Sequence, residues 1–242
     1  MHAGQKYNDP GSGDERLWAA VELYNATRGR IFLEYISNSN LPPFGLGWTN
    51  TGSYAFFSFL DHNREESGSE LYQRMKDRFY ADTAELLARR QRSAYGVALD
   101  RYVWGSNMDA ANAAMHFLLA NRLSPDSGYV DATLDQFHYL MGRNATGISY
   151  VTCYGGRCAL HPHHRPSMAR GSRVPGMLVG GPFSGVSRIA RDPASALFTK
   201  DTPPAKCYAD RYESFSTNEI CVYWNSPLAY ILAYLNDSAQ GR

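Results

Sequence analysis

The sequence predicts an all-α fold built from helix hairpins that pack antiparallel against one another. Three observations lead to this prediction. Apolar residues recur at three- and four-residue steps over most of residues 1–142, and breaks with Gly, Asn, Ser or Pro separate these stretches. No segment shows the sustained alternation of a strand. Residues 143–225 show no sustained periodicity, and a final helix is predicted over 226–238. We interpret residues 1–142, 143–225 and 226–238 as three parts of one domain, of which the middle part is a long loop region.

The first two predicted helices follow an N-terminal loop, residues 1–13, that is rich in Gly, Asn, Asp, Pro and Ser. Asp14 is suited to cap the first helix, whose apolar residues wrap around most of its surface and predict burial on several sides. The second helix is short. It runs through Ile31, Phe32 and Tyr35 and ends at a break that contains two prolines.

Four more helices are predicted before residue 143. The longest has Leu71, Met75 and Phe79 at four-residue steps with charges between them, which is typical of an amphipathic helix. Gly142 is placed to end the last of the four. The predicted ranges are Trp48–Leu60, Ser69–Arg92, Met108–Leu123 and Tyr129–Met141.

Composition narrows the class of partner. The chain has 242 residues, and its 44% apolar content is enough for a sizeable core. Lys plus Arg number 24 against 23 Asp plus Glu, so no strong field is available to bind nucleic acid or an anionic membrane. The longest apolar run, Ala110–Ala120, falls well short of a membrane span. A neutral partner therefore fits best.

The four cysteines leave two alternatives open. Cys153 and Cys158 flank a Gly-Gly turn that is short and flexible enough to bring their Cβ atoms within bridging distance. They form either a disulfide, which would favour an oxidising compartment, or two free thiols. The other two are Cys207 and Cys221, and no pair has the Cys-x-x-Cys spacing of a zinc ribbon.

Two carboxylates near the C-terminus form the first candidate functional cluster. Asp210 and Glu219 lie among aromatic residues and amides in the stretch YADRYESFSTNEICVYWNS. An isolated Glu beside Phe215, Ile220 and Trp224 would be partly desolvated, which raises its pKa toward that of a proton donor. The alternative is a solvated Glu on a surface loop.

The second cluster is the stretch SYVTCYGGRCALHPHHR, which contains three histidines within four positions. Imidazole is a common zinc ligand, so a metal site is one interpretation. The spacing argues against it, because the adjacent His163 and His164 cannot easily face one ion. Another interpretation is that these loop histidines hydrogen-bond to backbone carbonyls.

Both clusters resemble the signatures of glycoside hydrolase family 9, the inverting cellulases. The first signature is matched by Ser149, Val151, Thr152, Gly155, Arg157 and Pro162-His163-His164-Arg165, and the second by Tyr208, Asp210, Phe215, Asn218-Glu219 and Asn225-Ser226-Pro227. Weaker matches, GDERLWAAVELYNAT, YVWGSN and DQFHYLMGRNATGISYVT, extend the resemblance from about Tyr7 to Leu235. It is strongest to members with an immunoglobulin-like module before the catalytic domain. Cys221 departs from the small Ala, Ser or Thr usual there.

The resemblance implies an (α/α)6 barrel, of which this chain has about half the helices, with the active site in loops at one end. It implies that Glu219 is the catalytic acid, that Asp210 is an active-site carboxylate, and that His163 and Arg165 hydrogen-bond to sugar hydroxyls. The expected catalytic residues are Glu219, Asp210 and His163, and the expected substrate-binding residues are Arg165, His164, Tyr150, Trp104, Trp224 and Asn218. Trp48, Trp104 and Trp224 are candidate sugar platforms, with core packing as the alternative for each.

The family takes its catalytic base from an Asp-x-Gly-Asp motif, which does not occur in this sequence. We therefore expect a truncated, secreted β-1,4-glucanase that has the acid but not the base, with low activity alone and the missing N-terminal half as a partner. Asn-x-Ser/Thr sites at Asn25, Asn144 and Asn236 fit secretion. The alternatives are a carbohydrate-binding remnant without catalysis and a hydrolase for another β-linked sugar. No cofactor is expected; some family members bind calcium, but no ligand set is identified here.

Overall fold

The computed structural model describes residues 9, 11–47 and 49–239, without the side chains of 238 and 239. Among these residues the regular structure is helical, with isolated β-bridges and no strand. The chain divides into two compact units, Met1–Thr83 and Ala84–Arg242, and the division falls within helix α4 (Glu70–Arg92). Trp48, a candidate sugar platform, lies outside the described residues. Within the described part, no helix has both the length and the apolar character needed to cross a bilayer.

The first unit contains α1 (Gly13–Thr27), α2 (Arg30–Asn38), α3 (Gly52–His62), the 3-10 turn η1 (Arg64–Glu66) and the start of α4. Helix α1 packs against both α2 and α3. The helical repeat of the sequence produces this packing, because Leu17, Val21, Phe56 and Phe59 all point inward and have no exposed surface. The predicted helices are therefore present, although α3 begins at Gly52 and not at residue 48.

Asp14 does not cap α1, contrary to the sequence-based expectation. The helix begins at Gly13 with Ser12 as its N-cap residue. The Asp14 carboxylate instead accepts hydrogen bonds from the backbone N–H of Thr51 at 2.6 Å and from the Thr51 hydroxyl at 3.2 Å. A contact across 37 residues thus replaces the local cap that sequence spacing suggested.

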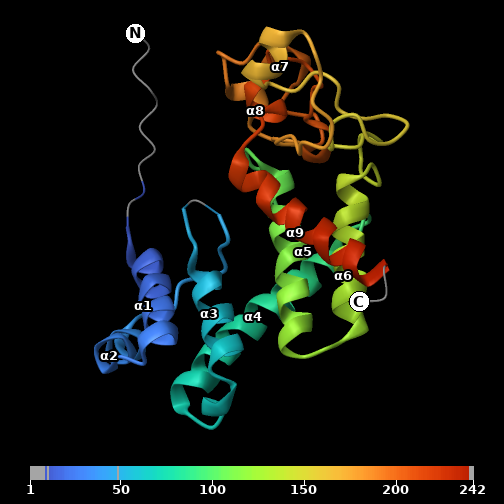
Figure 1. The fold of residues 1–242 in the computed structure, drawn as a ribbon. Coiled ribbons are helices and arrows are strands. Elements are labelled where there is room, and N and C mark those ends of the chain that lie inside the picture. The colour runs from blue at the N-terminus through green and yellow to red at the C-terminus, as the bar shows by residue number, and fades with distance from the viewer. Residues whose placement is uncertain (1–8, 10, 48, 240–242) are drawn as a thin grey trace. The chain divides into compact units, whose positions relative to one another are not determined.

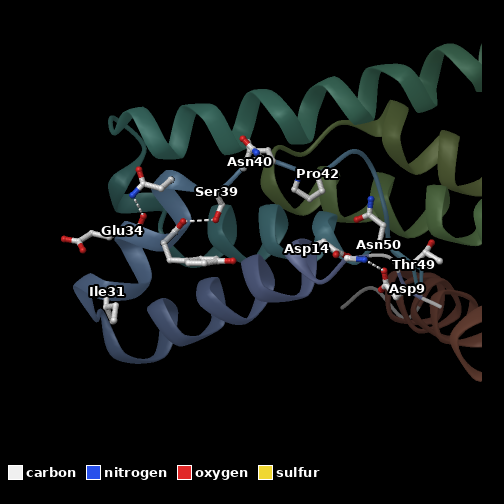
Figure 2. A pocket seen from close by; sticks show the side chains of 14 residues that line it. Asp9, Asp14, Ile31, Glu34, Ser39, Asn40, Pro42, Thr49 and Asn50 are labelled. Carbon is white, nitrogen blue, oxygen red and sulfur yellow. Dashed lines mark hydrogen bonds between the residues drawn. The ribbon is translucent and has the colours of Figure 1, made fainter. Parts of the chain in front are cut away.

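A cavity of about 840 Å³ opens within this unit. Figure 2 shows several of its polar side chains, including Asp14, Glu34, Ser39 and Asn50. Its described lining residues fall between Asp9 and Asn50, and among the residues that the structure describes none of the expected catalytic or substrate-binding residues contributes to it.

The second unit is organised around α5 (Ser106–Leu123), which packs against both α6 (Ser127–Leu140) and α9 (Val222–Ala239) (Figure 1). Helix α5 is buried along almost all of its length, as its Ala-rich, apolar sequence requires. Gly142 ends α6 as predicted: its φ is +116°, its N–H bonds to the Tyr139 carbonyl, and the N–H of Arg143 bonds to the His138 carbonyl. This is the Schellman arrangement, which requires a left-handed residue.

The long segment between α6 and α9 holds short helices and turns: α7 (Arg165–Arg170), η2 (Val186–Arg188), η3 (Pro193–Leu197), η4 (Pro204–Lys206) and α8 (Phe215–Asn218). It lies beyond the N-terminal ends of α5 and α9 (Figure 1). Isolated β-bridges connect stretches of this segment that are distant in sequence: Val151 pairs with Leu178, and Val179 pairs with Ile220. The Asn107 amide donates to the Val179 carbonyl at 2.9 Å and the Ser106 hydroxyl to the Pro182 carbonyl at 2.7 Å, so α5 fixes this segment in place.

All four cysteines are free thiols in this structure, so the Cys153–Cys158 disulfide, one of the two alternatives, is not formed in it. Cys153 has a positive φ of 62°, which is uncommon for a residue with a Cβ.

Candidate active site

The structure brings the two predicted motifs side by side. The backbone N–H of His163 donates to the Asn218 carbonyl at 2.7 Å, and His163 and Glu219 form a parallel bridge. On the other side, the N–H of Gly180 donates to the Glu219 carbonyl at 3.0 Å. The backbone of Glu219 is therefore held between two other passes of the chain, which fixes the position from which its side chain projects.

The Glu219 carboxyl is partly buried and accepts a hydrogen bond from the Trp104 indole, whose Nε1 donates to Oε2 at 3.2 Å. Burial raises the pKa of Glu219 above its ordinary value, while the Trp104 hydrogen bond and the nearby His163 oppose this shift. Because burial is the larger effect, Glu219 retains its proton to a higher pH than an exposed glutamate does. This is the property that a general acid needs.

Trp104, which donates to the Glu219 carboxyl, belongs to a cluster of aromatic rings. The Trp104 ring lies 5.6 Å from Phe215 and 6.0 Å from Phe183, centroid to centroid, and Phe215 in turn meets the His163 ring edge-on at 6.2 Å. Trp104 itself is only partly buried, so its expected contact with a sugar remains a prediction.

His163 is locked in orientation. Its Nδ1 lies 2.6 Å from the carbonyl oxygen of Tyr212, and since a carbonyl only accepts, Nδ1 carries a hydrogen and donates it. Within the described residues, Nε2 has no hydrogen-bond partner. His164 is also fixed, by a 2.8 Å hydrogen bond between its Nδ1 and the Ser167 hydroxyl. Arg165, the first residue of α7, is exposed and forms no ion pair with any described side chain.

Asp210 accepts hydrogen bonds at both of its carboxylate oxygens. Its Oδ1 accepts from the His161 N–H at 2.8 Å and from the Asn218 amide at 3.1 Å. Its Oδ2 accepts from the Leu160 N–H at 2.9 Å and from the His161 Nδ1 at 3.2 Å. These four donors occupy the four acceptor positions of a carboxylate. The contacts show that Asp210 holds the histidine loop against Asn218, and its expected catalytic role stays a prediction.

Three expected substrate-binding residues are buried and cannot touch a sugar in this structure. The Asn218 side chain donates to the His161 carbonyl at 2.5 Å and accepts from the Tyr208 hydroxyl at 2.7 Å, so it joins the two motifs from inside. Tyr150 has no exposed surface and packs against Tyr208, with ring centroids 4.9 Å apart. Trp224 fills the space beside Gly105, where an added Cβ would lie only 2.9 Å from the indole.

Sequence reasoning missed two residues of this network. His161 binds the Asp210 carboxylate, whereas we considered it as a metal ligand or as a partner of backbone carbonyls. Asp192 lies in the long loop and is fully buried, and nothing in the surrounding sequence distinguishes it from a loop-capping aspartate. No set of three or more His, Cys, Asp and Glu side chains within the described ranges is arranged to hold a metal ion.

Comparison with known proteins decides the family. The sequence profile described as Glycosyl hydrolase family 9 matches residues 1–232. The chain belongs to this family. A cellulose 1,4-beta-cellobiosidase from Acetivibrio thermocellus is 32% identical over 97% of the chain and 29% of its own length. Endoglucanase D from the same organism is 30% identical over 94% of the chain and 35% of its length. This family 9 chain thus spans about a third of the length of these two relatives.

Solved structures agree. AaCel9A in complex with cellobiose-like isofagomine is 33% identical, with a TM-score of 0.87, and the match covers 96% of this chain and 45% of that one. The structures that match are (α/α)6 barrels, so the expected fold, part of such a barrel, is confirmed.

Proposed function

We propose that this family 9 chain carries the acid side of a site that hydrolyses β-1,4-glucan with inversion. The observation that carries the proposal is the partly buried Glu219 carboxyl, which lies beside Trp104 and is joined through the backbone to His163. In this role Glu219 donates its proton to the glycosidic oxygen as the bond to the leaving sugar breaks. His163 Nε2 and the exposed Arg165 guanidinium are suited to hydrogen-bond to the hydroxyls of the sugar beside it.

Inversion also needs a base that activates water on the opposite face of the sugar, with the two carboxyl groups about 6.5–9.5 Å apart. Asp210 is poorly suited to this role because donors already fill its acceptor positions. We propose that the base comes from residues outside this sequence, as the absence of an Asp-x-Gly-Asp motif suggests. Since cellulose is an extracellular polymer, a secreted location is part of the proposal.

Titration calorimetry with cellotetraose tests the binding part. Replacing Arg165 by alanine is expected to weaken binding about 10-fold or more, because a hydrogen bond to a charged group contributes about 1.5–3 kcal/mol. Arg170→Ala is the matched control, since Arg170 is an exposed arginine at the other end of α7. Equal binding by the two variants would contradict the proposed contact.

Reducing sugar measured in the same samples separates catalysis from binding. The chain alone should release product slowly, since loss of a general base costs about 10²–10⁴-fold in rate. Rapid hydrolysis of cellotetraose would show that a base is present after all. Binding without any hydrolysis, even when an external nucleophile is added, would favour the alternative of a carbohydrate-binding protein. Parallel titrations with oligosaccharides of other β-linked sugars would identify a different substrate.

A further inference from the structure

We propose that Asp192 is a positioning residue for the acid: its buried carboxylate fixes α8, and α8 in turn holds Asn218 and Glu219 in place. The inference rests on the proposed role of Glu219. Asp192 lies in the loop before η3, has no exposed surface, and pairs with no Lys, Arg or His side chain in the described part of the chain. A buried carboxylate without a cation must be stabilised by hydrogen-bond donors.

The donors come from two separate segments. Oδ1 accepts from the N–H of Ala194 at 2.9 Å, within the loop that carries Asp192. Oδ2 accepts three hydrogen bonds from the segment that precedes Glu219: the Ser216 N–H at 2.9 Å, the Ser216 hydroxyl at 2.5 Å and the Ser214 hydroxyl at 3.3 Å. Both serines are fully buried. Asp192 therefore joins the loop to the first turn of α8 by a set of contacts from which water is excluded.

Helix α8 has only four residues, Phe215–Asn218, and is too short to be stable through its own hydrogen bonds. Yet two of its residues reach the acid. The Phe215 ring lies between Trp104 and His163, and Asn218 immediately precedes Glu219 and binds the His161 carbonyl. A displacement of α8 would therefore alter the ring packing of Trp104, which donates to the Glu219 carboxyl, and the backbone position from which Glu219 projects.

The chemistry of the contacts explains why an aspartate is required. All four groups that face the carboxylate can donate, and two of them are backbone N–H groups that cannot reverse their role. In Asp192→Asn, the amide NH2 would face at least one of these N–H donors whichever way it is oriented. The variant keeps the size of the side chain but not the match between donors and acceptors.

The test uses Trp104 fluorescence as a reporter, because its indole donates to the Glu219 carboxyl and should respond when that carboxyl loses its proton. The signal of Trp104 is the difference between the chain and its Trp104→Phe variant at each pH. In Asp192→Asn we expect the pH midpoint of the Trp104 signal to move lower, toward the value of an exposed glutamate. We also expect the amplitude of the signal to be smaller. Asp201→Asn, an exposed aspartate of the same long loop, should leave both unchanged.

Two further variants keep the result interpretable. Ser216→Ala removes one donor to Asp192 and retains the backbone N–H. It should therefore shift the midpoint in the same direction as Asp192→Asn, by a smaller amount. If Asp192→Asn unfolds, the titration of Ser216→Ala tests the inference in its place. Identical titrations for Ser216→Ala and Asp201→Asn, or for Asp192→Asn and Asp201→Asn, would overturn the inference. Glu219→Gln should abolish the Trp104 titration; if it does not, the proposed role of Glu219 fails, whatever Asp192 does.

Discussion

Glutamine in place of Glu219 is expected to lower the rate at which the chain cleaves cellotetraose by about 10²–10⁴-fold, the typical contribution of a general acid. Sodium azide added to both proteins supplies an external nucleophile in place of the missing base, so that the acid step can be measured. The loss should depend on the leaving group. In a dinitrophenyl β-cellobioside the leaving group is dinitrophenolate, a stable anion that departs without protonation, so Glu219→Gln should cleave this substrate nearly as fast as the unmodified chain does.

The control for this experiment is Glu213→Gln, because Glu213 is an exposed glutamate six residues earlier. It should behave like the unmodified chain on both substrates. If Glu219→Gln lost activity equally on cellotetraose and on the dinitrophenyl substrate, the residue would be acting in binding or folding, and its assignment as the acid would be wrong.

The second large effect is expected at Asp210. Alanine there would leave two backbone N–H groups, the Asn218 amide and the His161 ring without their shared acceptor. Hydrogen bonds to charged groups contribute about 1.5–3 kcal/mol each, and water can replace some of them at this partly exposed side chain, so we expect the free energy of unfolding to fall by about 3 kcal/mol. Denaturant unfolding measures this change.

Asp210→Ala should also weaken cellotetraose binding, because Asp210 holds the backbone of the loop that leads to His163. Asp201→Ala, at an exposed position, should change neither quantity. A catalytic but non-structural Asp210 would give the opposite pattern, with stability and binding retained and hydrolysis lost, and that result would restore the role first expected from the sequence.

The helices were predictable from the sequence because the apolar spacing and end residues that determine a helix lie within or next to it. Met75 and Phe79 repeat at four-residue steps, and both are fully buried on α4. Gly142 ends α6 because only a residue tolerant of positive φ completes the turn there. The ends of other helices were less predictable. Asp14 has the right side chain for a cap, but a bond to Thr51, far along the chain, takes precedence.

The candidate site was predictable only through the resemblance of its motifs. Spacing within each motif says nothing about the contact between His163 and Asn218, which joins segments 55 residues apart. The type of amino acid also does not indicate whether its side chain is buried. Trp104 and Trp224 are the same amino acid in similar surroundings of sequence, yet Trp104 reaches the Glu219 carboxyl and Trp224 packs against glycine backbone in the core. Asp192 shows no sequence signal because its partners come from a distant segment.

The measurement that tests the central claim most directly is the pH titration of the Glu219 carboxyl carbon by NMR, in protein labelled with ¹³C at its glutamates. Comparison with Glu219→Gln assigns the resonance. We predict a midpoint above that of a glutamate in a short unstructured peptide, because burial disfavours the ionised form of Glu219. A Glu219 midpoint equal to or below that of the peptide would contradict the assignment of Glu219 as the acid.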